Sequence, residues 1–143
     1  MYDVQGKYQK AIESFINAIE INGDEAIYHV KLSIALFRNG LVNKAFSEVF
    51  AARRLEPKNP DIDFQLAEFL RQIKSWNRAI TNYNQILERN PDYGDAHCGL
   101  AMVYFQSGEA EEAEGAYLDC QQLSFNDNLK DEVEAAKARF EGR

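Results

Sequence analysis

The chain has few cysteines, a shortage of basic side chains and no long apolar run. Two cysteines in 143 residues are far too few for a small scaffold held together by disulfide bonds. No apolar run approaches the ~18 residues of a membrane-spanning helix, and the first ten residues lack the apolar core of a signal peptide. Membrane insertion and secretion therefore find no support, and we expect a cytoplasmic protein.

Acidic side chains are concentrated in the C-terminal third of the chain. The 16 Lys and Arg residues face 23 Asp and Glu residues, which gives a formal net charge of -7. Residues 92–143 carry 12 acidic and 4 basic side chains, whereas residues 1–91 carry 11 acidic and 12 basic side chains. A surface of this sign repels phosphate, and no basic stripe interleaved with aromatic residues is present. We therefore expect no nucleic-acid partner.

Similar residues recur along the chain every 34 positions. The recurring sets are Ala11, Ala45, Ala79 and Ala113; Leu32, Leu66 and Leu100; Phe15, Val49, Tyr83 and Tyr117; Gly6, Gly40 and Gly108; and Pro57 and Pro91. Lys74 occupies the slot that glycine holds elsewhere. Several independent columns with one period predict a stack of similar structural units.

Each unit is predicted to be a pair of helices. Its apolar residues follow the spacing i, i+3, i+4 of a helix rather than the alternation of a strand. Gly40 and Gly108 stand where the first helix of a pair ends, in a left-handed conformation that glycine adopts without strain. We expect either that Lys74 is strained there or that the turn is altered. Asn59 followed by Pro60 predicts the start of a helix, with Asn59 as its cap.

This register resembles the tetratricopeptide repeat (TPR) family, whose unit is also 34 residues long. Residues 26–59, 60–93 and 94–127 match three whole repeats. Residues 1–25 match a partial first repeat, and residues 128–141 match a capping helix, all within one array. The resemblance implies an all-α fold, a right-handed α-solenoid of stacked antiparallel helix pairs.

No catalytic or metal-binding constellation is visible. The chain has no glycine-rich phosphate-binding loop, no HExxH and no CxxC. His29 and His97 share a repeat position, usually Trp in the family, and we expect them roughly 20 Å apart, which excludes joint ligation of a metal. Polar packing between helices is their predicted role. We expect neither enzymatic activity nor a cofactor.

The two cysteines receive different predictions. Cys120 occupies a column of small and apolar residues, which indicates a buried thiol. Cys98 lies on a first helix, where we expect an exposed side chain, and a disulfide bond between the two is the minor alternative.

The resemblance implies that the first helices of the repeats line a concave groove. Its predicted lining is Ile27, Val30, Lys31, Ile34, Phe37, Arg38, Phe64, Glu68, Arg71, Cys98, Met102 and Phe105. The predicted function is to bind a peptide or an amphipathic helix of a partner protein, as a scaffold or assembly factor. Lys31, Arg38 and Arg71 are expected to orient an acidic group, and Glu68 to select against misplaced negative charge. The alternative is that the helix ending in Phe140 fills this surface.

One family mode of binding is predicted to be absent. TPR domains of chaperone adaptors hold a terminal carboxylate with Lys, Asn and Arg from their first helices. The matching slots here hold Val30, Ile34, Gln65, Asp95 and Gly99. We therefore expect no binding of chaperone C-termini by that route.

The N-terminal end suggests further alternatives. Met1 falls within what should be the leading helix of the first repeat, so the helix of Ala11 and Phe15 is expected to be half unpacked. We expect either a fragment of a longer array, including a targeting or regulatory part of a larger enzyme, or a homodimer formed through residues 1–20. The second case makes the chain a self-assembling scaffold.

Overall fold

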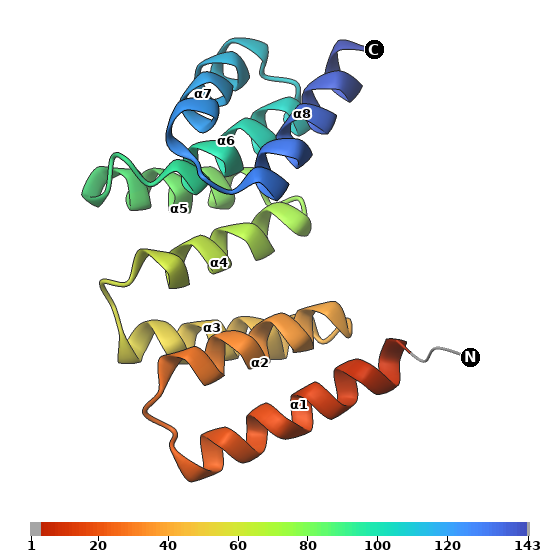
Figure 1. Ribbon diagram of the computed structural model, residues 1–143, viewed down its shortest axis with the longest axis vertical. Helices are drawn as coiled ribbons and strands as arrows, with labels where there is room; N and C mark the ends of the chain where they lie inside the picture. Colours follow the sequence, from red (N-terminus) through yellow and green to blue (C-terminus); the bar gives the residue numbers. More distant parts are fainter. Residues whose placement is uncertain (1–3, 143) are drawn as a thin grey trace. The chain divides into compact units, whose positions relative to one another are not determined.

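The computed structural model describes residues 4–142, with side chains from residue 6 onward, and these residues form eight α-helices and no strand. The helices are α1 (Val4–Ile21), α2 (Ala26–Arg38), α3 (Val42–Leu55), α4 (Pro60–Gln72), α5 (Trp76–Arg89), α6 (Gly94–Ser107), α7 (Ala110–Leu123) and α8 (Asp127–Glu141) (Figure 1). The predicted all-α fold is confirmed. In the described part of the chain, no helix has both the length and the apolar character needed to cross a membrane.

The chain divides into two compact units, and the division falls inside α4. Unit 1 comprises Met1–Gln65 and unit 2 comprises Leu66–Arg143. The limits predicted for the individual repeats stay a prediction.

Unit 1 is built around α2, which packs against α1 and α3. Its core includes Ile12 from α1, Leu32 and Leu36 from α2, and Val49 from α3, each at most 6% exposed. Ala45 is fully buried, so the small residue of this column lets the two helix backbones approach closely. Helix α1, which the sequence predicts to be half unpacked, therefore has one packed face.

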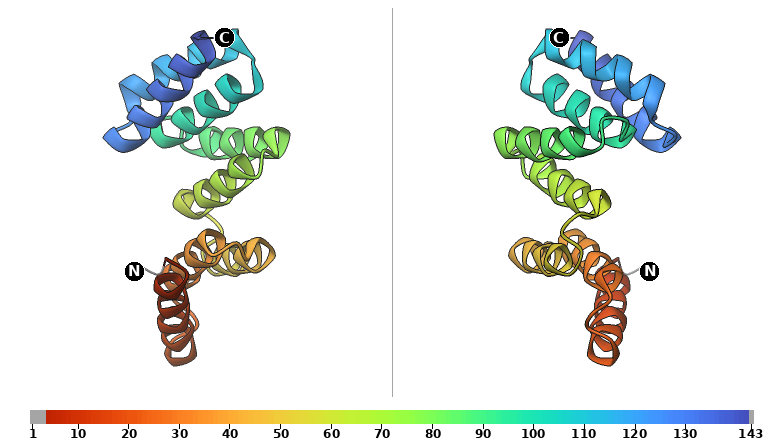
Figure 2. Two further views of the ribbon diagram at one scale, coloured as in Figure 1. Left: turned by 90° about the vertical axis from the view of Figure 1, so that its right-hand side faces the viewer. Right: turned by 90° about the vertical axis from the view of Figure 1, so that its left-hand side faces the viewer.

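Unit 2 is built around α6, which packs against α5, α7 and α8. The ribbons of α6, α7 and α8 lie together in both views of Figure 2. Nine of the 14 residues of α6 are buried. A helix that is apolar nearly all round has to be covered on several sides, and these three neighbours provide the cover. Val103 of α6 and Val133 of α8 are fully buried.

Side-chain caps start two of the helices. Asn59 accepts a hydrogen bond from the backbone N–H of Asp61 at 3.0 Å, just before α4, as the Asn59–Pro60 pair predicts. Asn126 accepts one from the N–H of Leu129 at 3.1 Å and begins α8.

The turns between paired helices contain the predicted left-handed residues. Gly40 has φ 82° and Gly108 has φ 90°, and Lys74 in the same slot has φ 63°. Added Cβ atoms at Gly40 and Gly108 would meet nothing within 4 Å, so backbone conformation alone favours glycine there. Lys74 keeps the same turn at a cost of about 1–2 kcal/mol of backbone strain. The expected strain at Lys74 is confirmed.

Candidate protein-binding site

An apolar groove runs between α1 and α2 in unit 1. Its volume is about 230 Å³. Lys7, Tyr8, Ala11 and Phe15 of α1 line one side, and Lys31, Ile34, Ala35 and Arg38 of α2 line the other. We call it the α1–α2 groove. Tyr8, Ala11 and Phe15 follow the spacing i, i+3, i+7, so they share one face of α1. Tyr8, Phe15 and Ile34 are half-buried and form its floor.

The edges of this groove are basic. Lys7, Lys31 and Arg38 are exposed, and the described lining contains no acidic side chain. Within residues 4–142, neither Lys31 nor Arg38 forms an ion pair. The groove therefore combines an apolar floor with a positive potential, which suits an apolar side chain flanked by carboxylates.

The structure brings three of the predicted groove residues together with residues that sequence reasoning missed. Lys31, Ile34 and Arg38 line the α1–α2 groove, whereas Ile27, Val30 and Phe37 lie elsewhere on α2. Ile27 is 50% exposed. The repeat pattern does not predict the lining from α1, because it assigns groove residues to the first helices of complete repeats. The helical spacing of Tyr8, Ala11 and Phe15 was a signal available to find it.

The predicted groove residues of α6 lie in the core of unit 2. Met102 is 4% exposed and Phe105 is 3% exposed. The Phe105 ring lies 5.7 Å from that of Phe140 in α8 and 6.3 Å from that of Tyr117 in α7, between ring centroids. At Phe105, the alternative that the helix ending in Phe140 fills the surface matches the structure.

The expected exposure of Cys98 is wrong. Cys98 is fully buried and forms a disulfide bond with Cys120, which joins α6 to α7. Sequence reasoning placed Cys120 correctly in the core but treated the disulfide as the minor alternative. In the disulfide, Cys98 offers no thiol to a ligand.

Glu68 and Arg71 bind each other instead of facing solvent. Arg71 Nη2 donates to Glu68 Oε2 at 2.7 Å, and the Tyr83 hydroxyl donates to Glu68 Oε1. Burial opposes the charge of Arg71, but the charge and hydrogen bond of Glu68, together with Tyr83, outweigh burial and hold the pKa of Arg71 above its ordinary value. Burial and the Glu68 charge together raise the pKa of Tyr83 well above 10.0. The three side chains form one buried polar network in unit 2.

The remaining site prediction on α4 is Phe64. It is half-buried on the part of α4 that belongs to unit 1, and it does not line the α1–α2 groove.

The backbone of α6 comes close to the ring of Tyr83. A Cβ at Gly99 would lie 2.3 Å from two ring carbons of Tyr83, a distance that no side chain tolerates. Glycine at this slot is thus explained by packing.

Each of the two histidines lies on one helix and contacts a carboxylate on the next helix. His29 Nδ1 lies 2.7 Å from Glu48 Oε2 of α3, and its Nε2 lies 3.0 Å from the carbonyl oxygen of Gly23. His97 Nδ1 lies 3.7 Å from Asp119 Oδ2 of α7. These contacts confirm the polar role between helices. The described residues contain no cluster of three or more potential metal ligands.

Sequence comparison relates both units to one family. The tetratricopeptide repeat family matches residues 2–60 and residues 74–119. Over 76 residues, the chain is 37% identical to cellulose synthase operon protein C of Pseudomonas fluorescens (strain SBW25). That match covers 53% of this chain and 6% of that protein, so the chain spans a small fraction of this relative's length.

Solved structures share the fold. The thermophilic TPR protein TTC0263 of Thermus thermophilus is 19% identical with a TM-score of 0.77, over 93% of this chain and 74% of that chain. A MamA structure is 19% identical with a TM-score of 0.69, over 98% and 94%. An O-GlcNAc transferase variant of Thermobaculum terrenum is 22% identical with a TM-score of 0.70, over 82% and 23%. These likenesses show the fold, and the two family matches show that the chain belongs to the tetratricopeptide repeat family.

Proposed function

We propose that this chain is a non-catalytic interaction module that binds an acidic, amphipathic segment of a partner protein in the α1–α2 groove, as a scaffold or assembly factor. The observation that carries the proposal is the composition of this groove: an apolar floor bordered by Lys7, Lys31 and Arg38, with no acidic side chain in the described lining. Membership of the TPR family supports the general role in protein–protein interaction.

The groove favours short contacts rather than a large interface. At about 230 Å³ it takes the apolar side chains of one helical turn or of a short extended stretch. Carboxylates beside those anchors meet Lys31 and Arg38 at an exposed edge, where each pair contributes about 0.2–1 kcal/mol. An interface at the small end of the usual range corresponds to micromolar affinity, about -8 kcal/mol.

Two matched peptides test the chemistry of the partner. Both carry Leu at positions i, i+3, i+4 and i+7; one has Glu at the other positions and the second has Lys. Fluorescence anisotropy of labelled peptides should show that the acidic peptide binds with micromolar affinity and that the basic peptide does not bind. The affinity for the acidic peptide should fall as salt is added. Equal affinity for the two peptides, or no binding of either, contradicts the proposal.

Charge reversal tests the location. Lys31→Glu combined with Arg38→Glu should weaken binding of the acidic peptide by roughly tenfold or more, because attraction becomes repulsion. The matched control is Lys10→Glu with Lys44→Glu, two exposed lysines that do not line the groove. This control changes the net charge equally and should reduce binding far less. Similar losses in the two variants place the site elsewhere.

A second candidate is a targeting or regulatory part of a larger protein. It is favoured by the comparisons in which this chain matches 6% of cellulose synthase operon protein C and 23% of the O-GlcNAc transferase chain. Determining the complete reading frame tests it, and a frame with no further domain contradicts it.

The homodimer and the cytoplasmic location both stay predictions. Residues 1–3 of the segment expected to dimerise lie outside the described residues. If the Phe15→Glu variant has the same molecular mass in solution as the unsubstituted protein, the result counts against a dimer formed through α1. The Cys98–Cys120 bond favours an oxidising compartment over the cytoplasm, because disulfide bonds persist in oxidising compartments and are rare in the cytoplasm.

A further inference from the structure

A second cavity lies within unit 2, beside the turn from α4 to α5. Its volume is about 730 Å³, and its lining is Arg71, Gln72, Lys74, Trp76 and Gln106. We call it the α4–α5 pocket. It shares no residue with the α1–α2 groove, and no role described above uses it.

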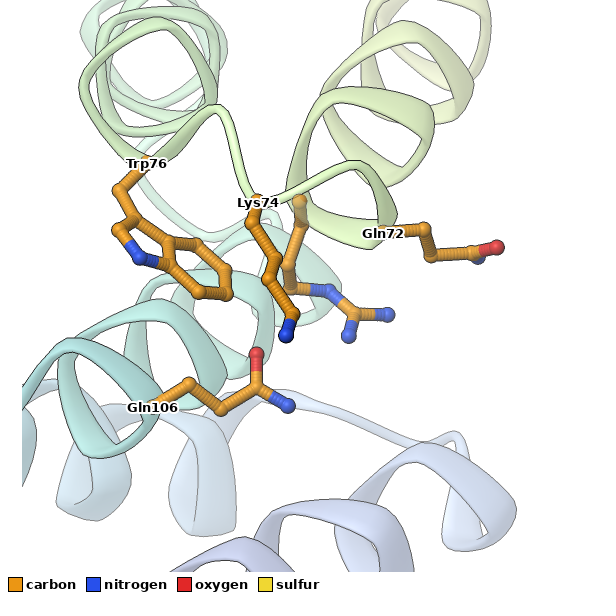
Figure 3. Close-up of a pocket in the computed structure, with 5 residues that line it drawn as sticks. Gln72, Lys74, Trp76 and Gln106 are labelled. Carbon is orange, nitrogen blue, oxygen red and sulfur yellow. The ribbon is translucent and has the colours of Figure 1, made fainter. Parts of the chain in front are cut away.

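The residues that line this pocket come from α4, the α4–α5 turn, α5 and α6. In Figure 3, Lys74 extends from the turn toward the carboxamide of Gln106 on α6, and the indole of Trp76 lies beside them. Gln72 points away at the edge. In the described part of the chain, the side chains of Gln72, Lys74 and Gln106 make no hydrogen bond or ion pair. The polar groups of Lys74 and Gln106 are thus available to a ligand in the pocket.

Lys74 is an unexpected choice for its position. It is the one non-glycine residue with positive φ among residues 4–142, in a slot that holds Gly40 and Gly108 in the other repeats. Glycine would make the same turn without strain. Strained backbone concentrates at binding sites, where the side chain rather than the turn is needed. We therefore infer that the strained backbone is tolerated at Lys74 because it places a lysine ammonium group beside Trp76.

The charges around the pocket sum to one positive charge. Arg71 lines the pocket but is already paired with Glu68 at 2.7 Å, so these two side chains neutralise each other. Lys74 adds one unpaired cation. A single carboxylate balances this charge, whereas a dianionic phosphate would leave an excess of negative charge beside Glu68.

The uncharged groups indicate what accompanies the carboxylate. Trp76 presents a flat apolar surface for an aliphatic or aromatic side chain. The carboxamide of Gln106 offers a donor and an acceptor, which are the complement of a peptide group. We propose that the α4–α5 pocket binds a Glu or Asp side chain of a peptide, with an apolar neighbour of that residue packed on Trp76.

Trp76 makes the binding directly observable, since it is the only tryptophan of the chain. Its fluorescence is followed while acetyl-Leu-Glu-Leu-amide is added, and in parallel acetyl-Leu-Gln-Leu-amide. The Glu peptide should change the emission saturably, and the Gln peptide should bind roughly tenfold more weakly, because its hydrogen bonds are no longer charge-assisted. Inorganic phosphate and glucuronate, as alternative anions, should bind more weakly than the Glu peptide.

Substitution of Lys74 separates binding from folding. Lys74→Gly should raise the thermal midpoint by a few degrees, because the strain is relieved, and weaken the Glu peptide about two- to fivefold. Lys74→Arg keeps the charge and should retain the affinity. Lys58→Gly, at an exposed lysine in another loop, is the matched control and should leave the affinity unchanged.

Several results overturn this proposal. They are the absence of a saturable Trp76 response, equal affinity for the Glu and Gln peptides, tighter binding of phosphate or glucuronate, and unchanged affinity in Lys74→Gly. The variant with Lys31→Glu and Arg38→Glu should keep the Trp76 response. Its loss there would refute a separate site, so failure of this proposal is distinguishable from failure of the α1–α2 groove.

Discussion

Helices α2 and α6 hold the same place in the repeat but have different surroundings. Ile34 of α2 and Met102 of α6 are equivalent positions, two repeats apart. Ile34 is half-buried and lines an open groove, whereas Met102 is 4% exposed inside unit 2. Arg38 and Gln106, likewise equivalent, belong to an apolar groove with basic edges and to a polar pocket respectively.

Helix α8 contributes to this difference in surroundings. Helix α8 packs on α6 and brings Phe140 to 5.7 Å from Phe105, between ring centroids. In unit 1, the described neighbours of α2 are α1 and α3. Packing of α8 thus turns part of the surface of α6, including Phe105, into core. The repeat register identifies equivalent positions, but the helices that pack around each position decide whether its side chain is exposed or buried.

The largest effect on stability is expected from disturbing the packing of α8 on α6. Val133 of α8 is fully buried, so Val133→Asp places a charge in the core and should lower the free energy of unfolding of unit 2 by more than about 4 kcal/mol. Ala135→Asp puts the same charge on the exposed face of α8 and should cost less than about 0.5 kcal/mol. Urea unfolding followed by Trp76 fluorescence measures both values. Equal stability of the two variants would mean that α8 does not cover α6.

The next effect concerns the Cys98–Cys120 bond, which exists in unit 2 alone because unit 1 contains no cysteine. The bond closes a loop with a sequence separation of 22, so reduction should destabilise unit 2 by about 3 kcal/mol. Urea unfolding with and without reductant, again read by Trp76, measures this loss. The variant with Cys98→Ala and Cys120→Ala is the control, since it should not respond to reductant. Two free thiols in the denatured, unreduced protein would contradict the bond.

The helix pairs could be predicted from the sequence, but their surroundings could not. Recurrence of Ala45 and Leu32 at 34-residue intervals predicts helices, because close packing needs small and large residues at fixed positions. The same periodicity does not say that Cys98 meets Cys120, or that α8 covers Phe105, since both depend on contacts between segments far apart in sequence. In the candidate site, Lys31, Ile34 and Arg38 were identified, and the face of α1 opposite them was missed.

A smaller effect is expected from the buried network of unit 2, which has no counterpart in the α1–α2 groove. Tyr83→Phe removes the hydroxyl that donates to Glu68 and should cost about 1–2 kcal/mol. Burial and the Glu68 charge raise the pKa of Tyr83 above that of the unfolded chain. Its stabilising effect is therefore complete below about pH 10 and is lost as the pH rises through the folded-state pKa.

Alkaline unfolding curves check the direction of this effect. Tyr83→Phe should flatten the fall in stability above pH 10, because one raised tyrosine pKa has been removed. Tyr117→Phe is the matched variant, since its hydrogen bond to Glu134 raises the pKa of Tyr117 to about 12, and its contribution should be lost between pH 10 and about pH 12. Identical curves for wild type and Tyr83→Phe would mean that the hydroxyl of Tyr83 is not buried beside Glu68.

The smallest change in stability is expected at Ile34, and truncating Ile34 and its equivalent Met102 is the most direct test of the comparison. Ile34→Ala should cost about 1 kcal/mol or less, because this side chain is already half in water, whereas Met102→Ala should cost about 2–5 kcal/mol. Binding of the acidic peptide should show the reverse order: Ile34→Ala removes an anchor and weakens it about fivefold or more, and Met102→Ala leaves it unchanged. Equal stability losses would show that α2 is as covered as α6. Equal binding losses would show that the floor of the α1–α2 groove is not where the peptide lies.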